Sequence, residues 1–165
     1  MPNLLALGIR QTLLLLAGIA LVLSASGFIL EYGFGVLPCH MCWWQRYMHY
    51  AILAASLIGL LLPPRHILKS CYPVILASLV GLGIAAWQYA AQHGWLPFPA
   101  SCTSGGMPTY ANPDDLLAAM QATKIVPCDK ENFTLLGLSL AGWNIPAMLL
   151  TLALSATPLL RRPIK

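Results

Sequence analysis

Two cysteines separated by two residues, Cys39 and Cys42, are the first feature of this sequence that could do chemistry. A disulfide over two intervening residues closes almost no chain entropy, so it would stabilise the fold very little. Such a pair is therefore more typical of a redox-active or metal-binding site than of a structural staple. Because His40 and Met41 add soft ligands between the cysteines, a copper- or zinc-binding protein is a competing interpretation.

A long apolar segment begins directly after this motif, so Cys42 should lie in the first turn of a helix. The unpaired N–H groups and the dipole of a helix start favour an anion and lower the pKa of a thiol there. Arg46 follows one turn deeper on the same helix face. An arginine facing lipid is costly, so we expect it to snorkel to the headgroups or to have a partner, such as a thiolate or an electron-rich ring. Gln45 is a second polar candidate, for binding or for helix packing.

Three more cysteines complete the set. Cys102 and Cys128 lie 26 positions apart in a polar stretch, and Cys71 stands alone at the start of an apolar one. The four cysteines other than Cys71 allow three disulfide pairings. The favoured one is Cys39–Cys42 with Cys102–Cys128, because the first two are already adjacent. The second pair could also be a simple loop staple.

The composition excludes an ordinary soluble domain and a disordered chain. Of 165 residues, 58% are hydrophobic and only 8% are charged, whereas soluble domains carry about 25% charged residues. No basic run suggests a nucleic-acid partner. The chain therefore predicts a single integral membrane unit over residues 1–165.

Four apolar segments are long enough to cross a bilayer as helices, at about residues 11–30, 43–62, 71–91 and 143–160. Unpaired strand edges are not tolerated in lipid, so helices are expected throughout. The predicted fold class is an all-α integral membrane protein, a four-helix transmembrane bundle with loops at about 31–42 and 93–142. In the longer loop, Asn112-Pro113-Asp114-Asp115 predicts the start of a short amphipathic helix that lies on the membrane surface.

The charges predict an orientation. Six of the nine basic residues precede the first segment, follow the last or lie between the second and third, and all five acids lie elsewhere. The positive-inside bias then puts both termini in the cytoplasm and residues 31–42 and 93–142 outside. The four paired cysteines fall on the outer side, where disulfides persist.

A different interpretation of the N-terminus makes residues 1–26 a cleaved signal peptide. Arg10 would be its basic region and Leu23-Ser24-Ala25-Ser26 its cleavage site. The apolar run continues through Leu30, which is too long for the core of a signal peptide.

These features together resemble the disulfide bond formation protein B (DsbB) family, the bacterial inner-membrane thiol oxidases. The resemblance covers about residues 10–160. It rests on Pro38-Cys39-His40-Met41-Cys42 followed by Gln45-Arg46-Tyr47, on the pair Cys102 and Cys128, and on Phe133-Thr134-Leu135-Leu136-Gly137-Leu138-Ser139.

The resemblance implies a role for each cysteine. Cys102 and Cys128 would meet a periplasmic thiol oxidase similar to DsbA, with Cys102 attacked by its reactive cysteine. An exchange between Cys128 and Cys39 would pass the electrons on, and Cys42 would be the thiolate beside a membrane quinone, ubiquinone or menaquinone. Arg46 would stabilise that thiolate–quinone pair.

The resemblance also suggests His93, in His93-Gly94-Trp95-Leu96, as a further quinone-site group, although an exposed interfacial histidine is the favoured interpretation. Two alternatives remain beside the metal-binding one. The chain could be a related oxidase with a dedicated partner other than DsbA, or a disulfide-stapled membrane subunit without catalysis.

Overall fold

The computed structural model describes residues 8–99, 102, 128 and 133–160. The described chain is mostly helical. Helix α1 spans Ile9–Phe28 and continues in a π-helical turn over Ile29–Gly33. Helix α2 spans His40–Leu61 and helix α3 spans Cys71–Gln92, with a 3-10 turn at Ile67–Ser70 between them. The last helix, α5, spans Leu140–Leu160.

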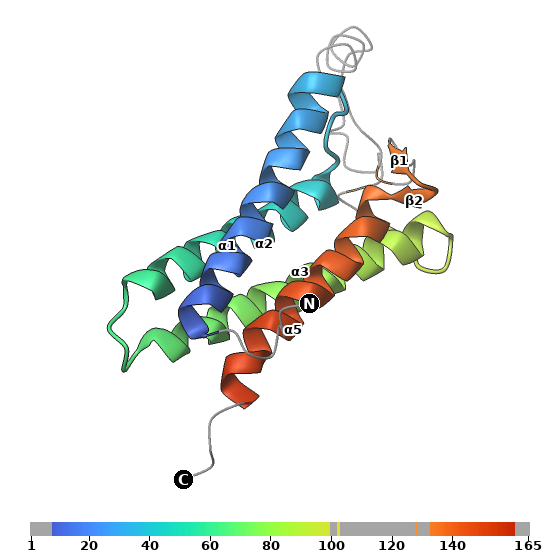
Figure 1. The fold of residues 1–165 in the computed structure, drawn as a ribbon. Coiled ribbons are helices and arrows are strands. Elements are labelled where there is room, and N and C mark those ends of the chain that lie inside the picture. Colours follow the sequence, from blue (N-terminus) through green and yellow to red (C-terminus); the bar gives the residue numbers. More distant parts are fainter. Residues whose placement is uncertain (1–7, 100–101, 103–127, 129–132, 161–165) are drawn as a thin grey trace, which may run out of the picture.

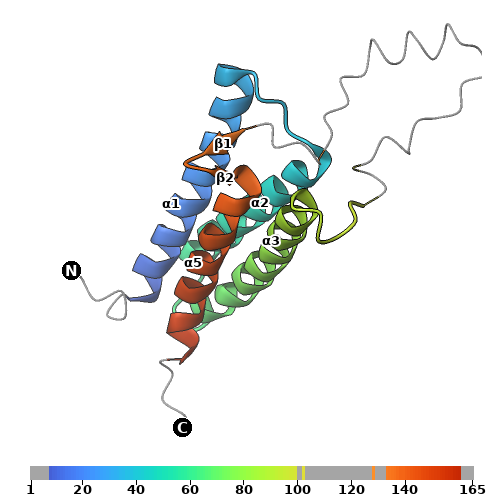
Figure 2. The same ribbon diagram turned by 90° about the vertical axis from the view of Figure 1, so that its right-hand side faces the viewer.

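The four long helices form one bundle (Figures 1 and 2). Helix α2 packs between α1 and α3, and α5 packs chiefly on α3 with a smaller contact to α1. The start of α1, the end of α5 and the connection between α2 and α3 lie at one end of the bundle. The other end holds the start of α2 and a small hairpin.

The centre of the bundle is apolar. Its largest cluster of buried side chains is made by Leu13, Leu16, Ala20, Ile52, Ile67, Val74, Ala77, Met148 and Leu154. Helices α3 and α5 approach closely at Gly81, where an added Cβ would lie 2.8 Å from the Met148 sulfur. A glycine at this position is what permits that approach.

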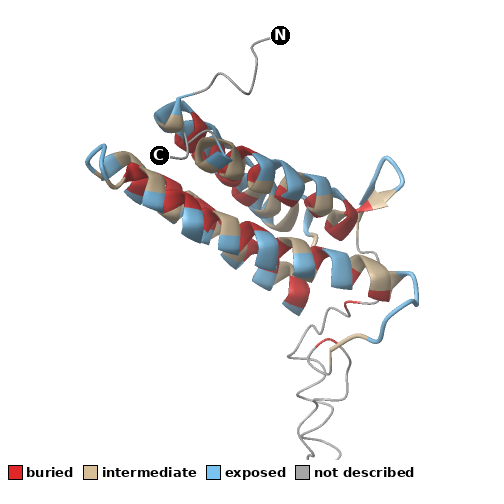
Figure 3. Cartoon of the chain, turned by 90° about the horizontal axis from the view of Figure 1, so that it is seen from below, coloured by how far each residue is buried: buried red, intermediate tan, exposed pale blue. Residues whose placement is uncertain are grey.

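The outer surface of the bundle is apolar as well. Large hydrophobic side chains such as Leu21, Ile58, Leu76 and Leu149 are exposed, and Figure 3 shows exposed and buried residues alternating around each helix. Among the residues that the structure describes, three segments are long and apolar enough to span a membrane: Ile9–Gly33, Ile67–Gln92 and Leu140–Leu160. An exposed apolar belt of this extent suits lipid rather than water.

A two-stranded hairpin precedes α5, where the sequence predicted only loop. Strands β1 (Thr134–Leu135) and β2 (Leu138–Ser139) are antiparallel, with Thr134 opposite Ser139. Leu136 and Gly137 form the turn with positive φ angles of 53° and 80°, which is the backbone that a two-residue hairpin needs. The Trp143 indole donates to the Leu135 carbonyl oxygen at 2.8 Å and ties the hairpin to α5.

The helix bounds differ by a few residues from those expected. Helix α5 begins at Leu140 rather than near Trp143, because it follows directly on strand β2. Helix α2 begins at His40 rather than at Trp43. The amphipathic helix expected at Asn112 lies outside the described residues.

Candidate redox site

The Cys-x-x-Cys motif forms the N-terminus of α2. Cys39 is the N-cap residue, and its sulfur accepts a hydrogen bond from the Cys42 backbone N–H at 3.4 Å. The two sulfur atoms lie 2.8 Å apart. Cys42 thus occupies the first turn of α2, just before the apolar part of the helix.

The two sulfurs have opposite acidities. A hydrogen bond from the Cys39 thiol lowers the pKa of Cys42, and the Gln88 amide, the helix backbone and the Arg46 charge lower it further against the effect of burial. The same bond with Cys42, together with burial, raises the pKa of Cys39. The reduced pair is therefore arranged as a Cys42 thiolate beside a Cys39 thiol.

The Gln88 side chain connects these sulfurs to α3. Its Nε2 atom lies 3.5 Å from the Cys39 sulfur and 3.7 Å from the Cys42 sulfur, within reach of weak hydrogen bonds to both. Gln88 is 3% exposed. Its own oxygen accepts a hydrogen bond from Gln45 Nε2 at 2.9 Å.

Gln45 continues a chain of polar groups into the bundle. Its oxygen accepts from Asn144 Nδ2 at 2.9 Å, and Asn144 Oδ1 contacts His49 Nε2 at 2.9 Å. The chain crosses from α3 to α2, to α5 and back to α2. Gln45, which was predicted to bind or to pack, makes hydrogen bonds to two neighbouring helices.

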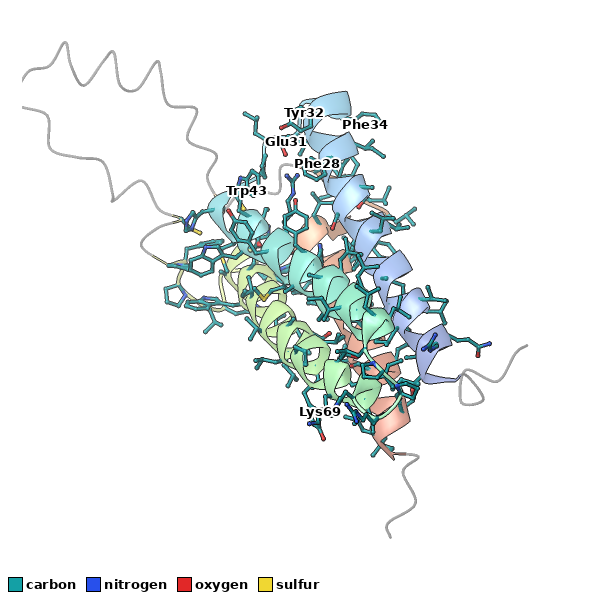
Figure 4. The ribbon with its side chains drawn as sticks, turned by 90° about the vertical axis from the view of Figure 1, so that its left-hand side faces the viewer. Phe28, Glu31, Tyr32, Phe34, Trp43 and Lys69 are labelled. Carbon is teal, nitrogen blue, oxygen red and sulfur yellow. The ribbon has the colours of Figure 1, made fainter. Side chains whose placement is uncertain are left out.

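Arg46 has a carboxylate partner that the sequence did not indicate. Its Nη1 donates to Glu31 Oε2 at 2.5 Å and its Nη2 donates to the Gly27 carbonyl oxygen at 2.7 Å. The guanidinium carbon lies 5.2 Å from the Phe28 ring centre and 5.0 Å from that of Trp43. Figure 4 shows Phe28, Glu31 and Trp43 together near one end of the bundle, with Lys69 at the opposite end.

The expected partner of Arg46 was a thiolate or an electron-rich ring. The Phe28 and Trp43 rings do lie beside the guanidinium, but its hydrogen bonds go to Glu31 and to the Gly27 carbonyl oxygen. The guanidinium is held by Glu31 and Gly27 and acts on Cys42 only through its charge. The π-helical turn that follows α1 carries Glu31 back over the start of α2. Because Glu31 is the one acid near the first two helices in the sequence, charge pairing could have suggested it.

The second cysteine pair lies against the first. Cys102 and Cys128 are buried in one cluster with Cys39 and Met41, and Cys42, Ile84 and Phe98 pack against it. Cys102 is 8% exposed and Cys128 1%. The structure thus brings together the four cysteines that the sequence singled out, whereas Cys71 lies buried at the far end of α3.

A cavity of about 170 Å³ adjoins both motif sulfurs and Arg46. Apolar residues from the end of α1 and the connection to α2 form much of its wall, among them Leu23, Leu30, Val36 and Leu37. Its polar lining includes Gln45, Arg46, His49, Gln88, Gln92 and Asn144. The cavity therefore joins an apolar wall to hydrogen-bonding groups and to the reactive sulfurs.

His93 does not lie with these groups. It is exposed at the end of α3, where its Nδ1 contacts the Tyr89 carbonyl oxygen at 2.9 Å and its ring lies against Tyr89 and Trp95. It is absent from the residues that line the cavity. Within residues 8–99, 102, 128 and 133–160, no group of three or more His, Cys, Asp or Glu side chains is arranged to hold a metal ion.

Gln88 and Asn144 were not singled out from the sequence. Each is an amide side chain within a long, mostly apolar run, and this is the signal that could have marked them. Buried polar groups in a membrane bundle need partners. That rule does not say which residue the partner is, so the contact of Gln88 and Asn144 with the cysteine site is known only from the fold.

Comparison with known proteins identifies the family. The protein-family model described as "Disulfide bond formation protein DsbB" matches residues 9–157 of this chain. A curated relative from Pseudomonas savastanoi pv. phaseolicola, named disulfide bond formation protein B 1, is 30% identical and covers 92% of this chain and 90% of its own.

Two other relatives named disulfide bond formation protein B agree with this. The protein from Actinobacillus pleuropneumoniae is 28% identical over 84% of this chain and 78% of its own. That from Marinobacter nauticus is 27% identical over 85% of each chain. No solved structure matches the chain. The family match covers nearly all of the four long helices and every cysteine, so the chain belongs to the DsbB family of membrane proteins for disulfide bond formation.

Proposed function

We propose that this protein is a thiol:quinone oxidoreductase that reoxidises a DsbA-like periplasmic protein and delivers the electrons to ubiquinone or menaquinone. The observation that carries the proposal is the contact between three features: the four-cysteine cluster, the low-pKa Cys42 and the cavity beside Arg46. Family membership supplies the general chemistry, the formation of disulfide bonds.

The first step is a disulfide exchange at the second pair. A thiolate of the partner attacks Cys102, forms a mixed disulfide and releases Cys128 as a thiolate. The partner's second thiol then displaces Cys102, so the partner leaves oxidised and both loop cysteines are reduced. The resemblance to the DsbB family is what assigns the attack to Cys102, since both loop cysteines are buried.

The second step passes the electron pair to the motif. Cys128 as a thiolate attacks Cys39, and Cys42 leaves as a thiolate. Cys102 then closes the loop disulfide and releases Cys39 as a thiol. Two features support this order: Cys128 is packed against Cys39, and the low pKa of Cys42 makes its sulfur the better leaving group.

The cavity fits the head group of a quinone. Such a head group is a flat ring with two carbonyl oxygens, and the cavity offers apolar walls with guanidinium and amide donors. Bound there, a quinone would supply an acceptor for two electrons and two protons. Arg46 would hold a carbonyl oxygen, and Cys42 would face the ring while Cys39 keeps its proton until the disulfide re-forms.

The proposed topology follows from the charges. Arg10 in the first turn of α1, and Arg65 and Lys69 between α2 and α3, lie at the end of the bundle away from the four-cysteine cluster, whereas Glu31 lies at the end that holds the cluster. By the positive-inside rule the cysteine end is periplasmic and both termini are cytoplasmic. In this arrangement α2 crosses the inner membrane as the fourth span.

The test uses the purified protein in detergent with reduced partner and a soluble quinone, following quinone absorbance. Wild type should turn over. Cys42→Ser should abolish quinone reduction while leaving a mixed disulfide with the partner at Cys102 detectable. Normal turnover in that variant would remove Cys42 from the pathway. Turnover with another periplasmic dithiol, and none with a DsbA-like protein, would assign a dedicated partner.

Arg46→Ala should raise the KM for quinone while exchange with the partner proceeds at the wild-type rate. An unchanged KM would exclude Arg46 from the quinone site. Exchange is measured separately by trapping the mixed disulfide, so loss of the fold is distinguished from loss of quinone binding.

A further inference from the structure

Four polar side chains form a continuous chain from the centre of the bundle to the motif sulfurs: His49, Asn144, Gln45 and Gln88. Each is at least nine-tenths buried. We propose that Gln88 is a further catalytic residue that stabilises the thiolate of the motif by N–H donation, and that the other three are positioning residues that fix the orientation of its amide. This inference rests on the proposed thiol chemistry.

The orientation of the Gln88 amide matters because its two ends have opposite effects on an anion. A thiolate can only accept hydrogen bonds, so the NH₂ group stabilises it and the carbonyl oxygen repels it. A free glutamine side chain could present either end. Some neighbour must therefore decide which end meets the sulfurs.

A series of hydrogen bonds to neighbouring side chains fixes the orientation of the Gln88 amide. The Gln88 oxygen accepts from the Gln45 amide nitrogen, and the Gln45 oxygen accepts from the Asn144 amide nitrogen. The Asn144 oxygen is left facing His49 Nε2 at 2.9 Å, so that nitrogen must carry a hydrogen. Every donor in the chain then points toward the sulfurs.

His49 is the first donor of this hydrogen-bonded chain, so its protonation sets the direction of donation along the chain. Its second ring nitrogen, Nδ1, is buried and has no hydrogen-bond partner among the described residues. A hydrogen there would be an unsatisfied buried donor, which is costly. The neutral ring with its hydrogen on Nε2 donates to Asn144 and leaves Nδ1 only as an unpaired acceptor, whereas the other tautomer would bury an unpaired N–H and face the Asn144 oxygen with a lone pair.

The geometry at the sulfurs fits a shared donor. The same Gln88 nitrogen lies 3.5 Å from Cys39 and 3.7 Å from Cys42, and it carries two hydrogens. It can therefore stabilise negative charge on Cys42 or on Cys39 without moving. That property suits a pair whose bond is broken and re-formed in each cycle.

Such a chain could instead serve only to hold helices together. The Ser78–Thr151 contact is an example of that role, since it joins α3 to α5 at 3.0 Å within the same bundle and does not reach a sulfur. Ser78→Ala is therefore the matched control, because it removes a buried polar contact between helices and leaves the chain to the sulfurs intact.

The test measures the pH at which Cys42 of the reduced full-length protein in detergent reacts half-maximally with iodoacetamide, with the product located by peptide mass spectrometry. Gln88→Met keeps the length of the side chain and removes the donor. A hydrogen bond to a charged group corresponds to about one to two pH units. The midpoint should rise by that amount, and it should not move in Ser78→Ala.

The positioning role is tested at Asn144, which does not touch a sulfur. Asn144→Asp can only accept, so Gln45 and then Gln88 must turn over and present oxygen to the sulfurs. This variant should shift the midpoint upward at least as far as Gln88→Met. Asn144→Leu, which adds no charge, should produce a smaller upward shift. A shift in Asn144→Asp alone would be an effect of charge and would overturn the positioning role.

An unshifted midpoint in Gln88→Met would overturn the role of Gln88. If that variant does not fold, an unshifted midpoint in folded Asn144→Asp would overturn that role instead. Folding is checked by thermal unfolding of each variant. Since alkylation needs neither quinone nor partner, the outcome is independent of the proposed function. If the wild-type protein does not reduce quinone but the alkylation midpoints of the variants shift as expected, the proposed function is refuted and the role of Gln88 is not.

Discussion

Gly27 on α1 provides a sharp test of how Arg46 is held. An added Cβ at this position would lie 3.0 Å from Arg46 Nε and 3.3 Å from Nη2. The guanidinium cannot easily give way, because Glu31 and the Gly27 carbonyl hold it and the Phe28 and Trp43 rings lie beside it. Gly27→Ala should therefore displace the guanidinium without changing any charge.

The same helix offers a control. Gly18 has no atom within 4 Å of an added Cβ, so Gly18→Ala should bring only the gain in helix propensity, about 0.5–1 kcal/mol. At Gly27 this gain is offset by weakening of a hydrogen bond from a charged group, which contributes about 1.5–3 kcal/mol. Gly27→Ala should lower the free energy of unfolding by about 1–2 kcal/mol, whereas Gly18→Ala should raise it.

Two assays read the outcome. Thermal unfolding in detergent compares the stabilities, and quinone titration of the steady-state rate gives the KM. If the displaced guanidinium binds quinone about 1.4 kcal/mol less well, the KM rises about tenfold. Equal stabilisation of both alanine variants with an unchanged KM would refute the reasoning that Gly27 seats Arg46 at the quinone site.

Two further predictions concern the cysteine pair and the hairpin. The Cys39 thiol, then Gln88 and Arg46, lower the pKa of Cys42 to about 6. The alkylation rate of Cys42 should therefore rise through pH 6 and level off by about pH 7. A rate that still rises through the ordinary thiol range near pH 8.5 would contradict this. Leu136→Gly should raise the free energy of unfolding by about 0.5–1 kcal/mol, because exposed Leu136 holds a positive φ that glycine adopts without strain. Leu135→Gly, in strand β1, should lower it, and the reverse ranking by thermal unfolding would show that the turn is unstrained.

The helical architecture and the membrane character could be predicted from the sequence. Uncharged apolar runs of about 20 residues have few alternatives in a chain with 8% charged residues. The Cys-x-x-Cys motif could be placed at a helix start for the same reason, because the apolar run begins directly behind it. The resulting proximity of Arg46 to Cys42 follows from helix geometry alone.

Contacts between segments distant in sequence could not be predicted in this way. The partner of Arg46 depends on the π-helical turn over Ile29–Gly33, which carries Glu31 to the start of α2. The hairpin escaped notice because its turn, Leu136-Gly137, lacks the usual Asn-Gly signal and the chain there is apolar. Gln88 and Asn144 are amide side chains in mostly apolar runs, and their partners lie on other helices.

Helix α2 differs from the other long helices because it carries the site. It is absent from the segments apolar enough to span a membrane by composition, and its buried face includes Gln45, Arg46 and His49. Isolated in lipid, each of these side chains would be costly. In the bundle each has a partner on another element. Gln45 contacts Gln88 and Asn144, and His49 contacts Asn144. Arg46 pairs with Glu31. The low hydropathy of α2 therefore reflects polar groups that neighbouring elements satisfy, and we expect α2 to cross the membrane inside the bundle while being unable to insert stably alone.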